Sequence, residues 1–207
     1  MRAPDPRPHH GSGGRHGNPE DLEAYLARLD DPARAAWQKP RKVVRALALR
    51  RGATVCEIGA GSGYLALRLS RAVGRAGHVY AVDAEPRMLE VLAARIREAR
   101  VRNVTPVLGL EDDPLLPTRS CDLIAIVDTY HHFPDGPAYL RRLVHALRRG
   151  GRLVNVDFHR RETPVGPPLE QRVAREAFLR DARRAGLTLS AEWDFLPYQY
   201  FLILRAR

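Results

Sequence analysis

The most constraining feature of this sequence is a glycine-rich turn that follows an apolar run. The run ends at Ile58 and leads directly into Gly59, Gly61 and Gly63. A second apolar run ends in Asp83, twenty residues after the last of these glycines. A strand that enters a glycine turn lets the backbone approach a ligand closely, and an acid ending the next strand can bind the vicinal hydroxyls of a ribose. Together the two features predict a ligand that contains a nucleoside.

The spacing of the glycines argues against a dinucleotide as that ligand. The dinucleotide fingerprint is Gly-x-Gly-x-x-Gly, and its third glycine would fall at the position of Tyr64. Gly63 comes one residue too early, and Glu57 lies at the end of the first strand. A carboxylate there would repel a pyrophosphate, whereas it would attract a cationic amino group and a sulfonium. We therefore expect a nucleoside ligand that carries positive charge.

These residues resemble the first motif of the class I S-adenosylmethionine-dependent methyltransferases, which reads Glu/Asp-x-Gly-x-Gly-x-Gly. The resemblance extends over most of the chain from residue 40 onward. It implies S-adenosylmethionine as the cofactor and S-adenosylhomocysteine as the product. The cofactor-binding residues that it implies in this first part of the chain are Glu57, Gly59, Gly61 and Gly63 around the methionine part and Asp83 on the ribose.

The resemblance also implies two acids further along the chain. The family often has an acid after the third strand that accepts a hydrogen bond from the adenine amino group, and Glu111, Asp112 and Asp113 follow that strand here. We choose Asp112 among the three, with a solvent-exposed acidic turn as the alternative. Asp128 ends the fourth strand, beside the place where the methyl group would emerge.

Short apolar runs alternate with helical patterns from residue 53 onward. The runs that we expect to be strands are 53–58, 78–83, 104–108, 122–128, 152–158, 187–195 and 198–205. Apolar residues one turn apart predict a helix after Pro86, another before Gly150, and a third around 168–185. We expect Gly150 and Gly151 to end the second of these helices.

This alternation predicts an α/β fold, with helices on both faces of a doubly wound, three-layer α/β/α arrangement. Only Leu196 and Pro197 separate the last two strands, and so short a link makes them antiparallel. The class I methyltransferases end their seven-stranded, mostly parallel sheet with such a reversed strand. We therefore expect seven strands, an antiparallel C-terminal strand, and a ligand site at the carboxyl ends of the parallel strands.

The chain divides into three expected segments. Residues 1–17 are rich in Pro, Gly, His and Arg with almost no apolar side chains, so we expect a disordered tail. Residues 18–49 carry helix starts at Asn18 and Asp31 and a break at Pro40, and we expect helices that cap the cleft. Residues 50–207 correspond to the methyltransferase domain.

The candidate acceptor site lies in the segment at the end of the fourth strand, at residues 128–134. A histidine whose pKa is near neutrality can remove a proton from an acceptor, which makes His131 and His132 candidate bases. The alternative is a structural or cofactor-contacting role for them. The residues that we expect around the acceptor are Trp37, Tyr130, His131, His132 and Tyr198. For Tyr130 the alternative is a packing role.

Composition bears on partners and location. The chain has 207 residues and a net charge of +10, with 32 arginines and two lysines. The arginines are dispersed over helical stretches without interleaved aromatics, which argues against nucleic acid as a partner. Cys56 and Cys121 lie in or beside apolar runs and are expected to be buried thiols. No apolar run is long enough to span a membrane and no signal peptide is recognisable, so a cytoplasmic protein is expected.

Missing motifs narrow the acceptor. The chain lacks the Asn/Asp-Pro-Pro-aromatic motif of amino-methylating nucleic acid enzymes. Enzymes that methylate a carbon of cytosine need a nucleophilic cysteine after the fourth strand, whereas Cys121 precedes that strand. Asp128, Asp157 and His159 could form a metal site, but the customary Asp-Asn pair is absent, so no metal is expected.

We therefore expect methyl transfer to a small-molecule acceptor by direct in-line displacement. The glycine loop also resembles that of the protein isoaspartyl methyltransferases, so a protein carboxylate is an alternative acceptor. A non-catalytic S-adenosylmethionine-binding or RNA-binding relative is the alternative from a different class.

Overall fold

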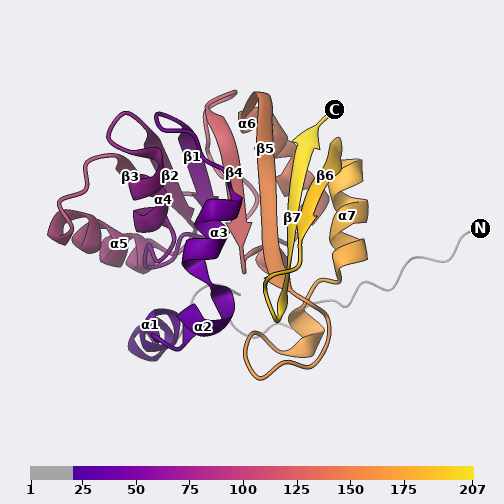
Figure 1. Cartoon of the computed structure of the whole chain (residues 1–207), viewed down its shortest axis with the longest axis horizontal. Helices are drawn as coiled ribbons and strands as arrows, with labels where there is room; N and C mark the ends of the chain where they lie inside the picture. Colours follow the sequence, from indigo (N-terminus) through magenta and orange to yellow (C-terminus); the bar gives the residue numbers. More distant parts are fainter. Residues whose placement is uncertain (1–20) are drawn as a thin grey trace, which may run out of the picture.

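The computed structural model describes residues 21–207 and contains all seven expected strands. The strands are β1 (Thr54–Ile58), β2 (His78–Asp83), β3 (Val104–Leu108), β4 (Cys121–Val127), β5 (Leu147–Phe158), β6 (Leu187–Trp193) and β7 (Gln199–Ala206). They form one sheet in the order β3-β2-β1-β4-β5-β7-β6 (Figure 1). The predicted bounds of β2 and β3 agree with the structure, and most others differ by one or two residues.

The sheet is mixed in the predicted way. β1 lies parallel to both β2 and β4, whereas β7 is antiparallel to β5 and to β6. The chain runs outward from β1 to β3 and then returns to place β4 on the other side of β1. Such a reversal of strand order opens a crevice at the carboxyl ends of the two central strands. The expected fold class is therefore confirmed.

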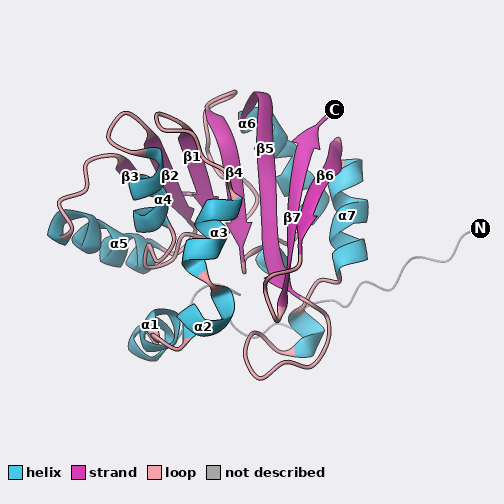
Figure 2. Cartoon of the chain, in the orientation of Figure 1, coloured by secondary structure: helices cyan, strands magenta, loops and turns pink. Residues whose placement is uncertain are grey.

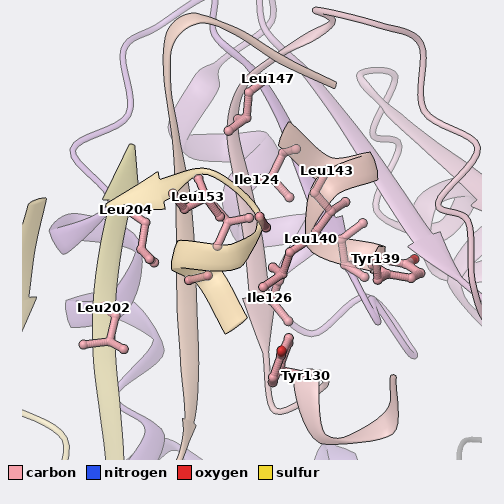
Figure 3. Close-up of a cluster of buried hydrophobic side chains, with 14 of the residues drawn as sticks. Ile124, Ile126, Tyr130, Tyr139, Leu140, Leu143, Leu147, Leu153, Leu202 and Leu204 are labelled. Carbon is pink, nitrogen blue, oxygen red and sulfur yellow. The ribbon is translucent and has the colours of Figure 1, made fainter. Parts of the chain in front are cut away.

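Helices cover both faces of the sheet (Figure 2). The described helices are α1 (Leu22–Asp30), α2 (Arg34–Gln38), α3 (Pro40–Ala46), α4 (Ala66–Val73), α5 (Pro86–Glu98), α6 (Gly136–Ala146) and α7 (Arg175–Arg184), with 3-10 turns η1 (Tyr130–His132) and η2 (Leu169–Gln171). Val43, Leu69 and Leu92 pack α3, α4 and α5 into the core on one face. Leu140 of α6, labelled in Figure 3, and Phe178 of α7 pack these helices into the core on the other face.

The end of α6 differs from the prediction. The helix ends at Ala146, and Leu147 already belongs to β5, so Gly150 and Gly151 lie inside a strand. The reason is long-range pairing: Leu147 is buried and lies opposite Cys121 of β4. That pairing competes with continuation of the helix, and no local pattern reveals it. The predicted role of the two glycines as a helix stop was wrong.

α1 and α2 lie beyond the carboxyl ends of the central strands, whereas α3 packs on one face of the sheet (Figure 1). Residues 1–20, which include the expected tail 1–17 and the Asn18 cap, fall outside the described residues. α1 begins after Asp21, whose side chain accepts a hydrogen bond from the Ala24 amide at 2.9 Å. Lys39 has a φ of 46° and separates α2 from α3, which begins at Pro40. Among the described helices none is long and apolar enough to cross a membrane.

Candidate active site

A cavity of about 380 Å³ lies at the carboxyl ends of β1, β2 and β4. The loop after β1 forms one wall, and the segments that follow β2, β3 and β4 form others. α1 and α2 contribute Tyr25, Leu29, Arg34 and Gln38. The volume lies within the range of small-molecule sites, about 300–1,000 Å³. The cavity occupies the switch point of the sheet, where ligands of doubly wound folds bind.

The glycine loop has a backbone that favours glycine. Gly59, Gly61 and Gly63 have φ values of 72°, 52° and 86°. A Cβ on Gly59 would overlap the side chain of Thr129, and one on Gly63 would overlap Leu92 of α5. Gly59 and Gly61 line the cavity, whereas Gly63 is set against the helix. Two of the three glycines therefore allow close approach to a ligand, and the third allows close packing.

Asp83 lines the cavity and also holds the glycine loop. Its Oδ2 accepts a hydrogen bond from the Gly61 amide at 2.7 Å, and its Oδ1 accepts one from the Glu85 amide at 2.9 Å. Burial raises the pKa of the Asp83 carboxyl, and these two amide donors oppose that rise. The side chain thus links the ends of β1 and β2 at the edge of the cavity.

Glu57 is a buried acid in the cavity wall. It is 4% exposed, and its Oε2 has no hydrogen-bond partner among the described residues. Burial raises the pKa of this carboxyl, while the guanidinium of Arg34 works in the opposite direction. A buried carboxylate oxygen without a donor is costly. A ligand with an ammonium group would satisfy it, so the residue fits the amino acid part of S-adenosylmethionine.

The acid expected on the adenine side is placed differently from the prediction. Asp112 does not line the cavity; its side chain is 75% exposed and lies 3.8 Å from Arg142. The reason is a turn closed by the Leu110 amide and the Asp113 carbonyl at 2.7 Å, which carries Asp112 outward. Glu111, its neighbour, does line the cavity.

Asp128 lies at the centre of a buried polar cluster. Its oxygens accept hydrogen bonds from Nε2 of Gln38 at 2.9 Å and from Nε2 of Gln199 at 2.5 Å. Arg34 adds a guanidinium nitrogen 3.7 Å away. Burial, and then the nearby charge of Asp157, raise the pKa of Asp128 to about 7. Its φ of 53° is one that Asp tolerates better than most residues.

His131 lines the cavity, and its ring contacts the buried carboxylate of Asp157. Its Nδ1 lies 3.2 Å from each carboxylate oxygen of Asp157, which is fully buried on β5. Burial works to lower the pKa of His131, but the hydrogen bond and the charge of Asp157 outweigh it and raise that pKa. His132 also lines the cavity, with its ring 4.2 Å from the ring of His131. Both histidines therefore line the cavity, and their role at the acceptor stays a prediction.

Tyr130 lies on the other side of the same turn, in the core. It is 3% exposed and lies in the cluster of buried side chains shown in Figure 3. Its hydroxyl donates to Asp181 of α7 at 3.0 Å. Trp37 packs against Phe158 and Tyr198, with ring centroids 5.4 and 6.5 Å apart. None of the three residues expected near the acceptor, Trp37, Tyr130 and Tyr198, lines this cavity.

Several cavity residues were not found from the sequence. Arg34 and Gln38 reach the site because α2 packs against the end of β4, which no local pattern indicates. Glu85 also lines the cavity, and its place before Pro86 at the start of α5 was a usable signal. Within residues 21–207, no group of three or more His, Cys, Asp or Glu side chains could hold a metal ion.

The fold and this site define a doubly wound α/β protein with a ligand cavity at its switch point. Residues 55–151 match the model of a methyltransferase domain. Over 108 residues the chain is 36% identical to protein-L-isoaspartate O-methyltransferase of Methanothrix thermoacetophila, covering 52% of this chain and 49% of that protein. It is 31% identical to the ubiquinone/menaquinone biosynthesis C-methyltransferase UbiE of Psychromonas ingrahamii, covering 59% and 48%. The chain thus spans about half the length of these curated relatives.

A solved structure extends the likeness over nearly the whole fold. A SAM-dependent methyltransferase from Aquifex aeolicus superimposes with a TM-score of 0.84 at 26% identity, covering 89% of this chain and 97% of that one. The present chain belongs to the class I S-adenosylmethionine-dependent methyltransferases.

Proposed function

We propose that this protein transfers a methyl group from S-adenosylmethionine to a small-molecule acceptor by direct in-line displacement. The main support for the proposal is that two chemically different groups of residues line the same cavity. Glu57 and the glycine loop form a wall suited to a cationic nucleoside, and His131 with its buried partner forms a wall suited to taking up a proton. Both walls meet where the strands end.

Five residues that line the cavity would hold the cofactor. Glu57 would accept hydrogen bonds from its amino group, and Gly59 and Gly61 would let the backbone approach its methionine part. Asp83 would accept from the ribose hydroxyls, because each carboxylate oxygen has lone pairs beyond the single amide bond that it accepts now. We assign the acid on the adenine side to Glu111 in place of Asp112. Bound S-adenosylmethionine supplies an electrophilic methyl group on its sulfonium.

His131 would take the proton that the acceptor loses as it attacks. Contact with both oxygens of Asp157 makes Nδ1 the donating nitrogen and leaves Nε2 to receive a proton. Asp157 acts as a positioning residue, since it holds the ring and stabilises the imidazolium that forms. The acceptor class is therefore a group that is protonated near neutral pH, such as a hydroxyl. Activity should rise with pH as His131 loses its proton.

α1 and α2 support a small acceptor over a protein segment. Gln38 donates to Asp128, and Lys39 donates to the Phe195 carbonyl at 2.7 Å, which fixes α2 over the strand ends. Asp30 at the end of α1 pairs with Arg95 of α5. Water exclusion and alignment of the reacting atoms are the main tasks in such a transfer. In this proposal the helices cap the cleft and perform both.

The test measures transfer of labelled methyl from S-adenosylmethionine into the small-molecule fraction of a cell extract. We expect His131→Gln to lower turnover by about 10²- to 10⁴-fold with cofactor affinity nearly unchanged. His145→Gln is the matched control, because His145 is exposed on α6 away from the cavity. Loss of turnover and affinity together would assign His131 to the cofactor-contacting wall instead.

A protein carboxylate is the second candidate acceptor. The 36% identity to a protein-L-isoaspartate O-methyltransferase over 108 residues favours it. Label recovered in the protein fraction, and absent from small molecules, would decide for this candidate. No label in any fraction, with cofactor binding intact, would leave a non-catalytic cofactor-binding protein.

A further inference from the structure

A second hollow lies at the opposite edge of the sheet from the candidate active site. It has a volume of about 720 Å³, and its lining residues come from the end of α4 and from the loops that lead into β1, β2 and β3. Figure 1 shows these loops at the amino ends of the three strands. Five of its nine lining residues are arginines and none is acidic. The five are Arg51, Arg71, Arg75, Arg100 and Arg102, and we call this feature the basic hollow.

The basic hollow is held together by side-chain bonds beneath the arginines. Asn103 donates from Nδ2 to the carbonyls of Gly74 at 2.9 Å and Ser70 at 3.3 Å, and the Ser70 hydroxyl donates to Asn103 Oδ1 at 2.6 Å. These bonds tie the loop before β3 to the end of α4. A Cβ on Gly74 would lie 2.7 Å from the Arg51 guanidinium, so this glycine lets Arg51 lie close against the turn. The segments that carry the arginines are therefore held together by these hydrogen bonds.

The charges of the basic hollow are not neutralised by the part of the chain that the structure describes. None of its five arginines makes an ion pair or a side-chain hydrogen bond within residues 21–207. Other arginines do pair: Arg142 lies 2.5 Å from Asp113, and Arg148 lies 2.8 Å from Asp122. Guanidinium groups from three separate segments therefore face one space without a counter-charge. Their mutual repulsion falls when an anion enters, and the combined field attracts one.

We propose that the basic hollow binds a compact oligophosphate, either a free inorganic chain or the phosphate chain of a nucleotide. Arginine forks match phosphate oxygens in a bidentate manner, and several converging forks favour an anion with several phosphates. The volume falls in the range of small-ligand sites, about 300–1,000 Å³. No aromatic side chain lines the hollow, so it offers no stacking platform for the bases of a single strand.

Calorimetric titration of the whole chain with inorganic tripolyphosphate tests the proposal, with S-adenosylmethionine present at saturation to occupy the active site. We expect one site whose affinity falls as salt is added. Arg71→Gln/Arg102→Gln should weaken binding at least tenfold; both side chains are exposed, so the fold should persist. Arg141→Gln/Arg180→Gln removes the same charge from exposed positions on α6 and α7 and should change affinity less than twofold. Equal losses in the two variants would mean attraction by net charge alone and would overturn the proposal.

Two further ligands distinguish the sources of the phosphate chain. If a nucleoside triphosphate binds more tightly than tripolyphosphate and loses affinity in the Arg71→Gln/Arg102→Gln variant, the ligand is a nucleotide. If the two bind equally tightly, the site recognises the phosphate groups alone. Binding of single-stranded RNA through these arginines without binding of tripolyphosphate would overturn the proposal in favour of an extended strand. Cofactor affinity serves as the folding control in every variant.

Discussion

Gln38 Nε2 lies 2.9 Å from Asp128 Oδ2, a hydrogen bond between residues ninety positions apart. It attaches α2 to the end of β4, directly above the cavity. Gln38 is 3% exposed although its side chain is polar, because both ends are used: Oε1 accepts from Arg34 Nε at 2.5 Å. Hydrogen bonds of Gln38 thus hold α2 against the end of β4 at the cavity.

Removal of the bond between Gln38 and Asp128 should weaken the attachment of α2 to the end of β4. We expect Gln38→Ala to lower the free energy of unfolding by about 1–3 kcal/mol, because it leaves a buried carboxylate short of a donor. Urea denaturation measures the change. Arg41→Ala, at an exposed position on the neighbouring α3, should cost less than about 0.5 kcal/mol. Equal costs for the two variants would show that the bond does not fix α2.

Asp83 is expected to be the main polar anchor for the cofactor. Asp83→Ala should weaken S-adenosylmethionine binding by about 1.5–3 kcal/mol, because it removes charge-assisted bonds to the ribose and the support of Gly61. Calorimetry measures the affinity. Asp112→Ala is the control, since Asp112 is exposed and outside the cavity. A comparable loss in Asp112→Ala would restore the adenine role that the sequence predicted for it.

The glycine loop can be tested with a matched pair of glycines. Gly59 and Gly150 have similar φ values, 72° and 77°, but a Cβ on Gly150 would meet nothing within 4 Å. Gly59→Ala should therefore cost more stability than Gly150→Ala, since it adds overlap with Thr129 to the strain of a positive φ. It should also abolish cofactor binding, which Gly150→Ala leaves intact. Thermal unfolding and calorimetry check both statements.

Asp128 should make stability depend on pH. Its folded-state pKa is raised from 3.8 to about 7, so the folded protein holds this proton more tightly than the unfolded chain does. The contribution to stability is therefore lost as the pH rises from about 4 to about 7. Asp128→Asn removes this titration, and Asn also tolerates the positive φ. The stability of the variant relative to wild type should rise over that window by at most about 4 kcal/mol. Urea denaturation at pH 4 and pH 8 measures the change; a constant difference between the two proteins would contradict the raised pKa.

Tyr130 should matter for stability and not for turnover. Tyr130→Phe removes the donor to Asp181 and should cost about 1–2 kcal/mol of unfolding free energy. Because the side chain points away from the cavity, kcat and cofactor affinity should stay within about twofold of wild type, which is under 0.5 kcal/mol. A large fall in kcat with normal stability would return Tyr130 to the acceptor site.

The fold could be predicted from the sequence because strand lengths and alternation are local signals. The bounds of β2 and β3 follow from apolar runs limited by polar residues or a glycine turn. The start of β5 could not be predicted, since Leu147 leaves the helix to pair with Cys121 in another strand. Strand pairing between distant residues overrode the local helical pattern there.

The site was predictable where chemistry is confined to a strand and the turn that follows it. Glu57, Gly59, Gly61 and Asp83 all line the cavity. In η1 the prediction could not separate Tyr130 from His131, because successive residues of a tight turn point to different sides. Asp157 was recognised from the sequence only as part of a candidate metal site. Its contact with His131 depends on β4 and β5 being neighbours.

The position of β7 has a consequence for synthesis on the ribosome. β7 lies between β5 and β6, yet it is the last of the seven strands to be translated. Until residues 199–206 emerge, β6 has no partner and one side of β5 is an open edge rich in apolar side chains. A nascent chain paused in this interval exposes a template for pairing with other chains. The edge of β5 is therefore covered only when the last strand of the sheet has been made.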